Sequence, residues 1–133
     1  MNDINSAEME KYFIAKTFNT PEINFLPEEG LLSITGRSIP EDPGELFDKL
    51  ISKIEEYYKN PQKITKVDIK LEYVNSGSAK YLLELMRIFK KHYLDNKECV
   101  INWYYEEDDE SIYELGLHYQ NTIPIPFKLI DYY

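Results

Sequence analysis

The sequence predicts a single α/β domain, with a mixed β-sheet of about five or six strands and three main helices mostly on one face. The chain has 133 residues, which suits one hydrophobic core. Strand and helix patterns alternate in its second half, which favours parallel neighbouring strands and right-handed crossovers. Charged and apolar residues alternate over residues 66–73, so the sheet is expected to keep one face partly wet.

The first part of the chain predicts a tail and three strands. Residues 1–10 are polar and are expected to be loose. Residues 12–17 have a strand pattern. Residues 23–25 and 31–35 predict a hairpin, and Gly36 is expected to end the sheet pattern.

The helices and the later strands follow in alternation. Residues 42–45 (DPGE) are typical of a helix start, with an aspartate for the cap and a proline for the first position. A second helix is expected after residues 75–78 (NSGS) and a third after residues 106–110 (EEDDE). Residues 99–105 predict a further strand, and residues 124–130 predict a last strand at a sheet edge, where prolines are tolerated.

The composition argues against several classes of partner and location. The net charge of −9 opposes sequence-independent binding to nucleic acid and to anionic membranes. The one cysteine, Cys99, cannot form an internal disulfide, which favours a reducing compartment. No signal peptide or membrane span is recognisable, so we expect a soluble cytoplasmic protein. No spacing typical of a metal site or cofactor motif is found.

Three predicted loops share one edge of the sheet. If the strands ending at Thr35, Tyr73 and Tyr105 are parallel, their carboxyl ends meet there. The loops are then residues 36–42 and the two polar segments at 75–78 and 106–110. This edge is where open α/β sheets usually carry their functional residues.

Residues 75–78 allow two interpretations. Asn75 or Ser76 could simply cap the helix that follows, because the first N–H groups of a helix need acceptors. Alternatively, Ser76 could be phosphorylated, since the helix dipole and free N–H groups favour a phosphate there. Gly77 would let another part of the backbone approach closely, and Ser78 could help or could be the cap.

The other two loops carry charge. Arg37 could pair with a carboxylate or a phosphate through its planar guanidinium, or it could pair with a neighbouring acid. The run at residues 106–110 suits a solvated helix start, and a divalent cation is a weaker alternative. Trp103, Tyr104 and Tyr105 belong either to the core or to a docking surface, and alternate residues should face opposite sides.

Nucleophilic catalysis has little support in the sequence. His92 and His118 fall late in predicted helices, away from Cys99 and the loop serines. Cys99 lies within a strand pattern and is expected to be a buried thiol. A small enzyme, or a ligand- or metal-binding domain that uses the three loops, is the alternative interpretation of function, and a purely structural subunit is a third.

Four blocks of sequence carry a resemblance that covers nearly the whole chain: TPEI from Thr20, GRSIPE from Gly36, LEYVNSGSAK from Leu71 and WYY from Trp103. Together they resemble the SiaC family of bacterial regulatory phosphoproteins. Ser76 stands where the family has its phosphoacceptor threonine. Gly77 and Ala79 stand where serine is frequent, and Ile39 replaces a common aromatic residue.

The resemblance implies a STAS-like domain, akin to anti-anti-sigma domains, that performs no catalysis itself. It implies an anti-sigma-type serine/threonine kinase and a PP2C-type phosphatase that act on Ser76. In the best-known system of the family, the unphosphorylated protein binds and activates a diguanylate cyclase, so a cyclase is a candidate target here.

We therefore predict a non-catalytic protein that switches partners according to the phosphorylation of Ser76. The predicted environment of the phosphosite comprises Asn75, Gly77, Ser78, Lys80 and Arg37. The predicted partner-binding residues are Arg37, Ser38, Glu41, Trp103, Tyr105 and Glu106.

Overall fold

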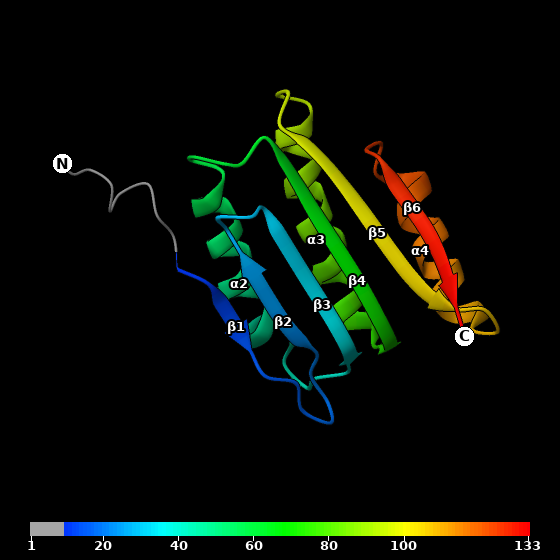
Figure 1. Cartoon of the computed structure of the whole chain (residues 1–133). Helices are drawn as coiled ribbons and strands as arrows, with labels where there is room; N and C mark the ends of the chain where they lie inside the picture. The colour runs from blue at the N-terminus through cyan, green and yellow to red at the C-terminus, as the bar shows by residue number, and fades with distance from the viewer. Residues whose placement is uncertain (1–9) are drawn as a thin grey trace.

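One six-stranded sheet contains the strands in the order in which they occur in the chain. The computed structural model describes residues 10–133, so the predicted loose tail lies outside the described residues except for Glu10. The elements are β1 (Tyr12–Ile14), β2 (Glu22–Leu26), β3 (Leu31–Ser38), α2 (Pro43–Tyr57), β4 (Ile64–Val74), α3 (Ser76–Tyr93), β5 (Glu98–Glu106), α4 (Glu110–Thr122) and β6 (Phe127–Tyr132). The β1–β2 and β2–β3 pairs are antiparallel, whereas the pairs from β3 to β6 are parallel (Figure 1). The predicted mixed sheet is confirmed.

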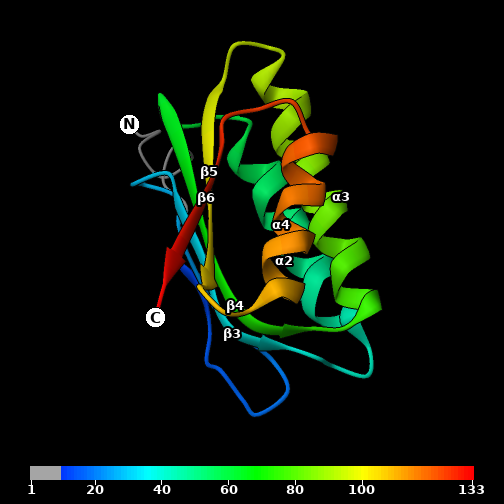
Figure 2. The same ribbon diagram turned by 90° about the vertical axis from the view of Figure 1, so that its right-hand side faces the viewer.

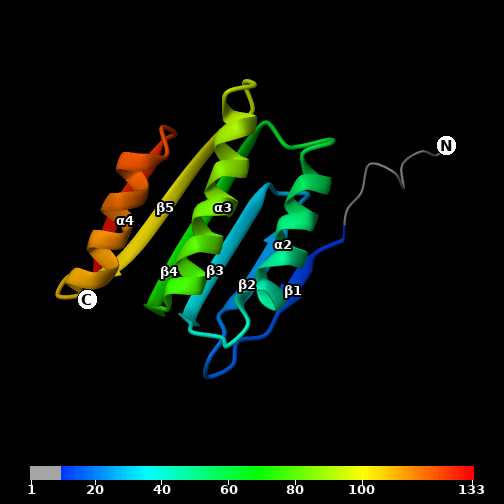
Figure 3. The same cartoon turned by 180° about the vertical axis from the view of Figure 1, so that it is seen from behind.

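The three helices of residues 10–133 lie on the same face of the sheet (Figure 2). Seen from behind, α2, α3 and α4 lie side by side across it (Figure 3). The central strand β4 shows why. Val67, Ile69 and Leu71 are buried, whereas Lys66 and Lys70 between them are exposed. The apolar side of the strand faces the helices, and the charged side belongs to the face that the helices leave uncovered, which we call the open face.

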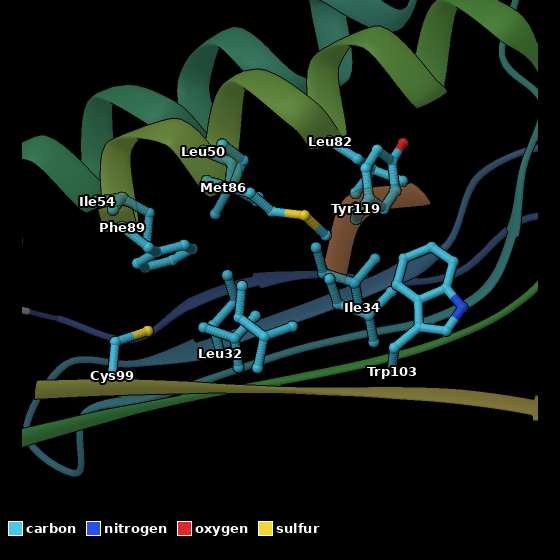
Figure 4. Close-up of a cluster of buried hydrophobic side chains, with 14 of the residues drawn as sticks. Leu32, Ile34, Leu50, Ile54, Leu82, Met86, Phe89, Cys99, Trp103 and Tyr119 are labelled. Carbon is cyan, nitrogen blue, oxygen red and sulfur yellow. The ribbon is translucent and has the colours of Figure 1, made fainter. Parts of the chain in front are cut away.

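The core fills the space between the helices and the sheet (Figure 4). Leu32, Ile34 and Trp103 rise from the sheet and are completely buried. Apolar residues at helical spacing meet them from above: Leu50 and Ile54 of α2, and Leu82, Met86 and Phe89 of α3. These are residues of the predicted amphipathic helices, so the helical patterns identified the buried faces correctly.

The boundaries of β3, β1 and β6 differ most from the prediction. β3 continues through Gly36 to Ser38, because Gly36 adopts a φ of 121° and the pairing with β4 shifts by one residue directly after it. β1 ends at Ile14 because residues 17–20 form a turn, in which the Thr17 hydroxyl accepts the N–H groups of Asn19 and Thr20. β6 begins three residues later than expected, after the prolines that cannot donate to its ladder.

The predicted common edge is confirmed. β3, β4 and β5 end at Ser38, Val74 and Glu106, and the chain passes from this edge into α2, α3 and α4 (Figure 2). We call this edge the carboxyl rim. The first and last of these helices start as the sequence predicts, since Asp42 accepts the N–H of Glu45 and Asp109 accepts that of Ile112.

Candidate functional site

The start of α3 is fixed to the end of β3 through Asn75. Its side-chain oxygen accepts the N–H of Ser78 at 2.9 Å, so Asn75 is the helix cap. Its side-chain amide donates to the carbonyl of Pro40 at 2.9 Å, and its backbone N–H donates to the carbonyl of Ser38 at 3.0 Å. A single residue thus closes the helix and fastens the loop between β3 and α2.

The two serines of this segment have opposite environments. Ser78 is fully buried, and its hydroxyl accepts a hydrogen bond from the buried hydroxyl of Ser38 at 2.8 Å. Ser76 is the first residue of α3 and is exposed. A modifying enzyme could therefore reach the hydroxyl of Ser76, whereas Ser78 would have to be extracted from the core first.

Gly77 brings the starts of two helices together. A Cβ placed on Gly77 would lie 2.7 Å from Cγ of Pro43, the first residue of α2. That distance is too short for two carbon atoms, so only glycine permits this approach. Because both helices point their N-termini at the rim here, the partial positive charges of two helix dipoles lie close to Ser76.

The first turn of α3 carries no acidic residue, unlike those of α2 and α4, which carry Glu45 and Glu110. Lys80 lies one turn after Ser76 and is exposed. An anion on Ser76 would therefore meet a helix start and a lysine four residues ahead, a favourable spacing for a pair of opposite charges.

Arg37 belongs to the carboxyl rim but lies on the open face. Its guanidinium carbon is 4.5 Å from the ring centroid of Phe18 and 5.5 Å from that of Tyr73. The alternation along β3 explains the direction, since the next residue, Ser38, points into the core toward Ser78. Within residues 10–133, no hydrogen bond or ion pair joins Arg37 to Ser76.

The other predicted partner-binding residues divide into accessible and buried groups. Glu41 and Glu106 are exposed and Tyr105 is half-buried against Tyr113. The prediction is wrong for Ser38 and Trp103, which are fully buried and cannot touch a partner in this fold. The indole N–H of Trp103 donates to the carbonyl of Ile112 at 2.9 Å, so this residue fastens α4 to the sheet.

The other side chains considered for chemistry are buried, stacked on a ring or used to cap a helix. Cys99 is buried, as predicted, and burial raises the pKa of its thiol to about 12. His92 stacks on Tyr58 with a centroid distance of 3.9 Å, and burial lowers the pKa of its imidazole. Asp109 of the acidic run caps α4. Within residues 10–133, no three potential metal ligands lie together, and no helix is long and apolar enough to cross a membrane.

Two contacts at the site are not predicted by the sequence. The hydroxyl of Tyr119 on α4 donates to the carbonyl of Ala79 in the first turn of α3 at 2.7 Å. The carbonyl of Pro40 is the second anchor of Asn75. Neither contact has a local signal in the sequence, because each joins residues that are 35 or 40 positions apart.

The fold and the rim define a small α/β domain with a mixed sheet, in which an exposed serine, Ser76, begins the helix after the inner strand β4. The family model described as SiaC family regulatory phosphoprotein matches residues 14–132, and the chain belongs to this family.

Solved structures of the family share the fold. SiaC of Pseudomonas aeruginosa superposes with a TM-score of 0.87 at 25% identity, over 93% of this chain and 100% of that one. A crystal structure of the diguanylate cyclase SiaD in complex with its activator SiaC, also from Pseudomonas aeruginosa, matches with a TM-score of 0.86 at 26% identity, over 91% and 99%. An uncharacterized protein of Pseudomonas aeruginosa strain UCBPP-PA14 is 26% identical over 91% of this chain and 96% of its own length.

Proposed function

We propose that this chain binds a protein partner under the control of phosphorylation at Ser76. The observation that carries the proposal is the contrast between the two serines at the start of α3. Ser76 is exposed at the first helical position, whereas Ser78 is buried and hydrogen-bonded to Ser38. Only Ser76 offers a hydroxyl that a kinase could reach without unfolding the helix start.

The surroundings of Ser76 suit a phosphate. The N–H of Ser78 donates to the side chain of Asn75, whereas the N–H groups of Ser76 and Gly77 donate to no acceptor within residues 10–133. These donors, the helix dipole and Lys80 would all favour a doubly charged group. The phosphate would therefore be held locally and would leave the fold intact.

The effect on a partner follows from charge. Unmodified Ser76 presents a small neutral hydroxyl on the rim, whereas the phosphate adds about −1.5 to −2 charges and a hydration shell. A partner that packs against the unmodified helix start would have to desolvate that charge or move away from it. Two of the predicted partner-binding residues lie on the helix side of the rim, because Glu41 precedes α2 and Tyr105 faces the helices. We therefore include both in the contact between the partner and the helix start at Ser76.

The nature of the partners is inferred from the family. SiaC of Pseudomonas aeruginosa forms a complex with the diguanylate cyclase SiaD and is named its activator. We propose a diguanylate cyclase as the target of this chain, and an anti-sigma-type kinase and a PP2C-type phosphatase as the enzymes that set its state. This role needs no catalysis by the domain itself.

Incubation with the cognate kinase and ATP, followed by mass spectrometry of peptides, tests the assignment of Ser76. We expect a phosphate on Ser76, none on Ser78, and no phosphate in Ser76→Ala. Partner binding by Ser76→Asp should be weakened, while Ser76→Ala should bind as the unmodified protein does. A phosphate on another residue, or equal binding by both variants, would contradict the proposal.

A further inference from the structure

An aromatic and cationic cluster occupies the open-face side of the carboxyl rim near β3. We call it the Arg37 patch, and it consists of Lys16, Phe18, Arg37 and Tyr73. Phe18 and Tyr73 are 73% and 58% exposed, which is unusual for rings of this size, and both flank the guanidinium of Arg37. Exposed aromatic rings around an arginine are the composition of a protein-binding hot spot.

The cations of this patch have no acidic partner in the described part of the chain. Lys16 and Arg37 border a hollow of about 450 Å³, whose wall also includes Glu72. Yet neither cation forms an ion pair within 4.0 Å. The one ion pair within residues 10–133 joins Lys59 and Glu56. The patch is therefore open to carboxylates from another molecule.

Acidic residues occupy the same rim on the other side of β4. We call Glu106, Glu107, Asp108 and Tyr132 the acidic patch. The three acids are exposed and, like the Arg37 patch, form no ion pair within residues 10–133. The backbone N–H of Glu107 donates to the carbonyl of Tyr132 at 2.8 Å, which holds the acidic turn against β6. The ring of Tyr132 lies 4.3 Å from the ammonium of Lys70 and faces the open side.

The two patches lie on opposite sides of the end of β4. β3 and β5 flank β4, and Arg37 and Glu106 stand near the ends of these two strands on the open face. The loop at residues 15–21 and the turn at residues 107–109 both project at this end of the molecule (Figure 1). A two-fold axis perpendicular to the sheet, through the end of β4, would bring the Arg37 patch of one copy against the acidic patch of a second.

We propose that two copies of this chain associate rim to rim through these patches. The contact is isologous, so each pair of patches forms twice. Charge complementarity identifies the second copy as the occupant, because one molecule carries both halves. Each exposed ion pair contributes little, and the net charge of −9 per copy opposes association. We therefore expect a weak and reversible dimer.

The dimer has a consequence for the phosphoswitch that rests on the proposed function. Ser76 comes two residues after the end of β4, so an axis through that end brings the Ser76 residues of both copies toward each other. Two phosphates near the axis would repel, so phosphorylation would favour the monomer. The association itself needs no phosphate, and its test therefore uses unmodified protein.

Sedimentation velocity over a series of protein concentrations tests the proposal with charge-swapped variants. The unmodified protein should sediment faster as its concentration rises. Arg37→Glu should remain monomeric, and so should Glu106→Lys/Glu107→Lys, because each homodimer then carries like charges at both contacts. An equimolar mixture of the two variants should regain the dimer. In the mixed dimer, the new glutamate at position 37 meets the new lysines at one contact, and the native Arg37 patch meets the native acidic patch at the other. Arg87→Glu on α3 is the matched control and should associate as the unmodified protein does.

Circular dichroism establishes that the variants are folded, and Lys16→Glu replaces Arg37→Glu if the latter is not. A monomer at all concentrations of the unmodified protein, or a mixture that stays monomeric, would overturn the proposed dimer and leave the role of Ser76 untouched. Dimers of each variant alone would overturn the assignment of the contact to these patches.

Discussion

Gly116 offers the sharpest test of how α4 packs on the sheet. A Cβ at this position would lie 2.3 Å from Cδ1 and 2.5 Å from Nε1 of Trp103, and 2.9 Å from a methyl group of Leu129. Trp103 is completely buried and cannot turn away. Gly116→Ala therefore has to push α4 away from β5 by about 1 Å or more to restore ordinary contact distances near 3.5–4 Å.

The size of the stability change follows from one favourable and two unfavourable effects. Alanine in the middle of a helix is about 1 kcal/mol more favourable for stability than glycine. Overpacking of a filled core costs about 1–3 kcal/mol. The displacement also stretches the 2.9 Å bond from the Trp103 indole to the Ile112 carbonyl, and leaving a buried donor unpaired costs about 1–3 kcal/mol. We expect the free energy of unfolding to fall by about 2–4 kcal/mol.

Urea denaturation followed by tryptophan fluorescence measures this change, because Trp103 is the one tryptophan of the chain. Gly44→Ala is the matched control. Its Cβ would meet the hydroxyl of Tyr81 at 2.8 Å, which is the far end of a side chain that can move, so we expect a much smaller loss. If Gly116→Ala were as stable as the unmodified protein, the close packing of α4 on Trp103 would be refuted.

Three further predictions concern buried and capping side chains. The hydroxyl of Tyr57 forms a hydrogen bond with that of Thr65 at 2.8 Å, whereas the buried hydroxyl of Tyr58 has no hydrogen-bond partner among residues 10–133. Tyr57→Phe should therefore lose about 1–2 kcal/mol of stability in urea denaturation, while Tyr58→Phe should lose none; equal losses would contradict this contrast. Burial lowers the pKa of His92 in the folded protein. The contribution of the neutral imidazole to stability is therefore complete above the unfolded pKa of about 6.5, and it is lost as the pH falls toward the folded pKa. Thermal denaturation should thus show that His92→Gln loses less stability than the unmodified protein between about pH 7.5 and about pH 5. The same pH profile in both proteins would argue against a contribution of buried, neutral His92. Asn75→Ala removes the cap of α3 and its bond to the Pro40 carbonyl, and should cost about 1–2 kcal/mol by the same urea assay, with Asn75→Asp retaining the cap; a loss below about 0.5 kcal/mol would show that the cap is dispensable.

The sequence was sufficient for the arrangement of the sheet and helices because the signals were local. The alternation of charge along β4 identified its open face, and the aspartate and proline before α2 marked its start. Gly36 was misjudged because glycine can either end a strand or permit a bulge within it. The choice depends on the neighbouring strand, which the local pattern does not contain.

The sequence predicted the helix start at residues 75–78 but not all the contacts around it. The exposed start of α3 followed from helical periodicity. The burial of Ser38 was not foreseen, and the sequence left Trp103 between the core and a docking surface, because the face on which a residue lies near a strand end depends on the register of pairing. The same register sends Arg37 to the open face, away from the helix start with which the sequence grouped it.

The affinity of the purified chain for a diguanylate cyclase, measured by isothermal titration calorimetry with and without a phosphate on Ser76, tests the central claim most directly. The account predicts that the unmodified protein binds and that the phosphate weakens binding by about 5- to 150-fold, the range of a typical coupling free energy of about 1–3 kcal/mol. A phosphorylated protein that binds as tightly as the unmodified one would contradict a switch at Ser76.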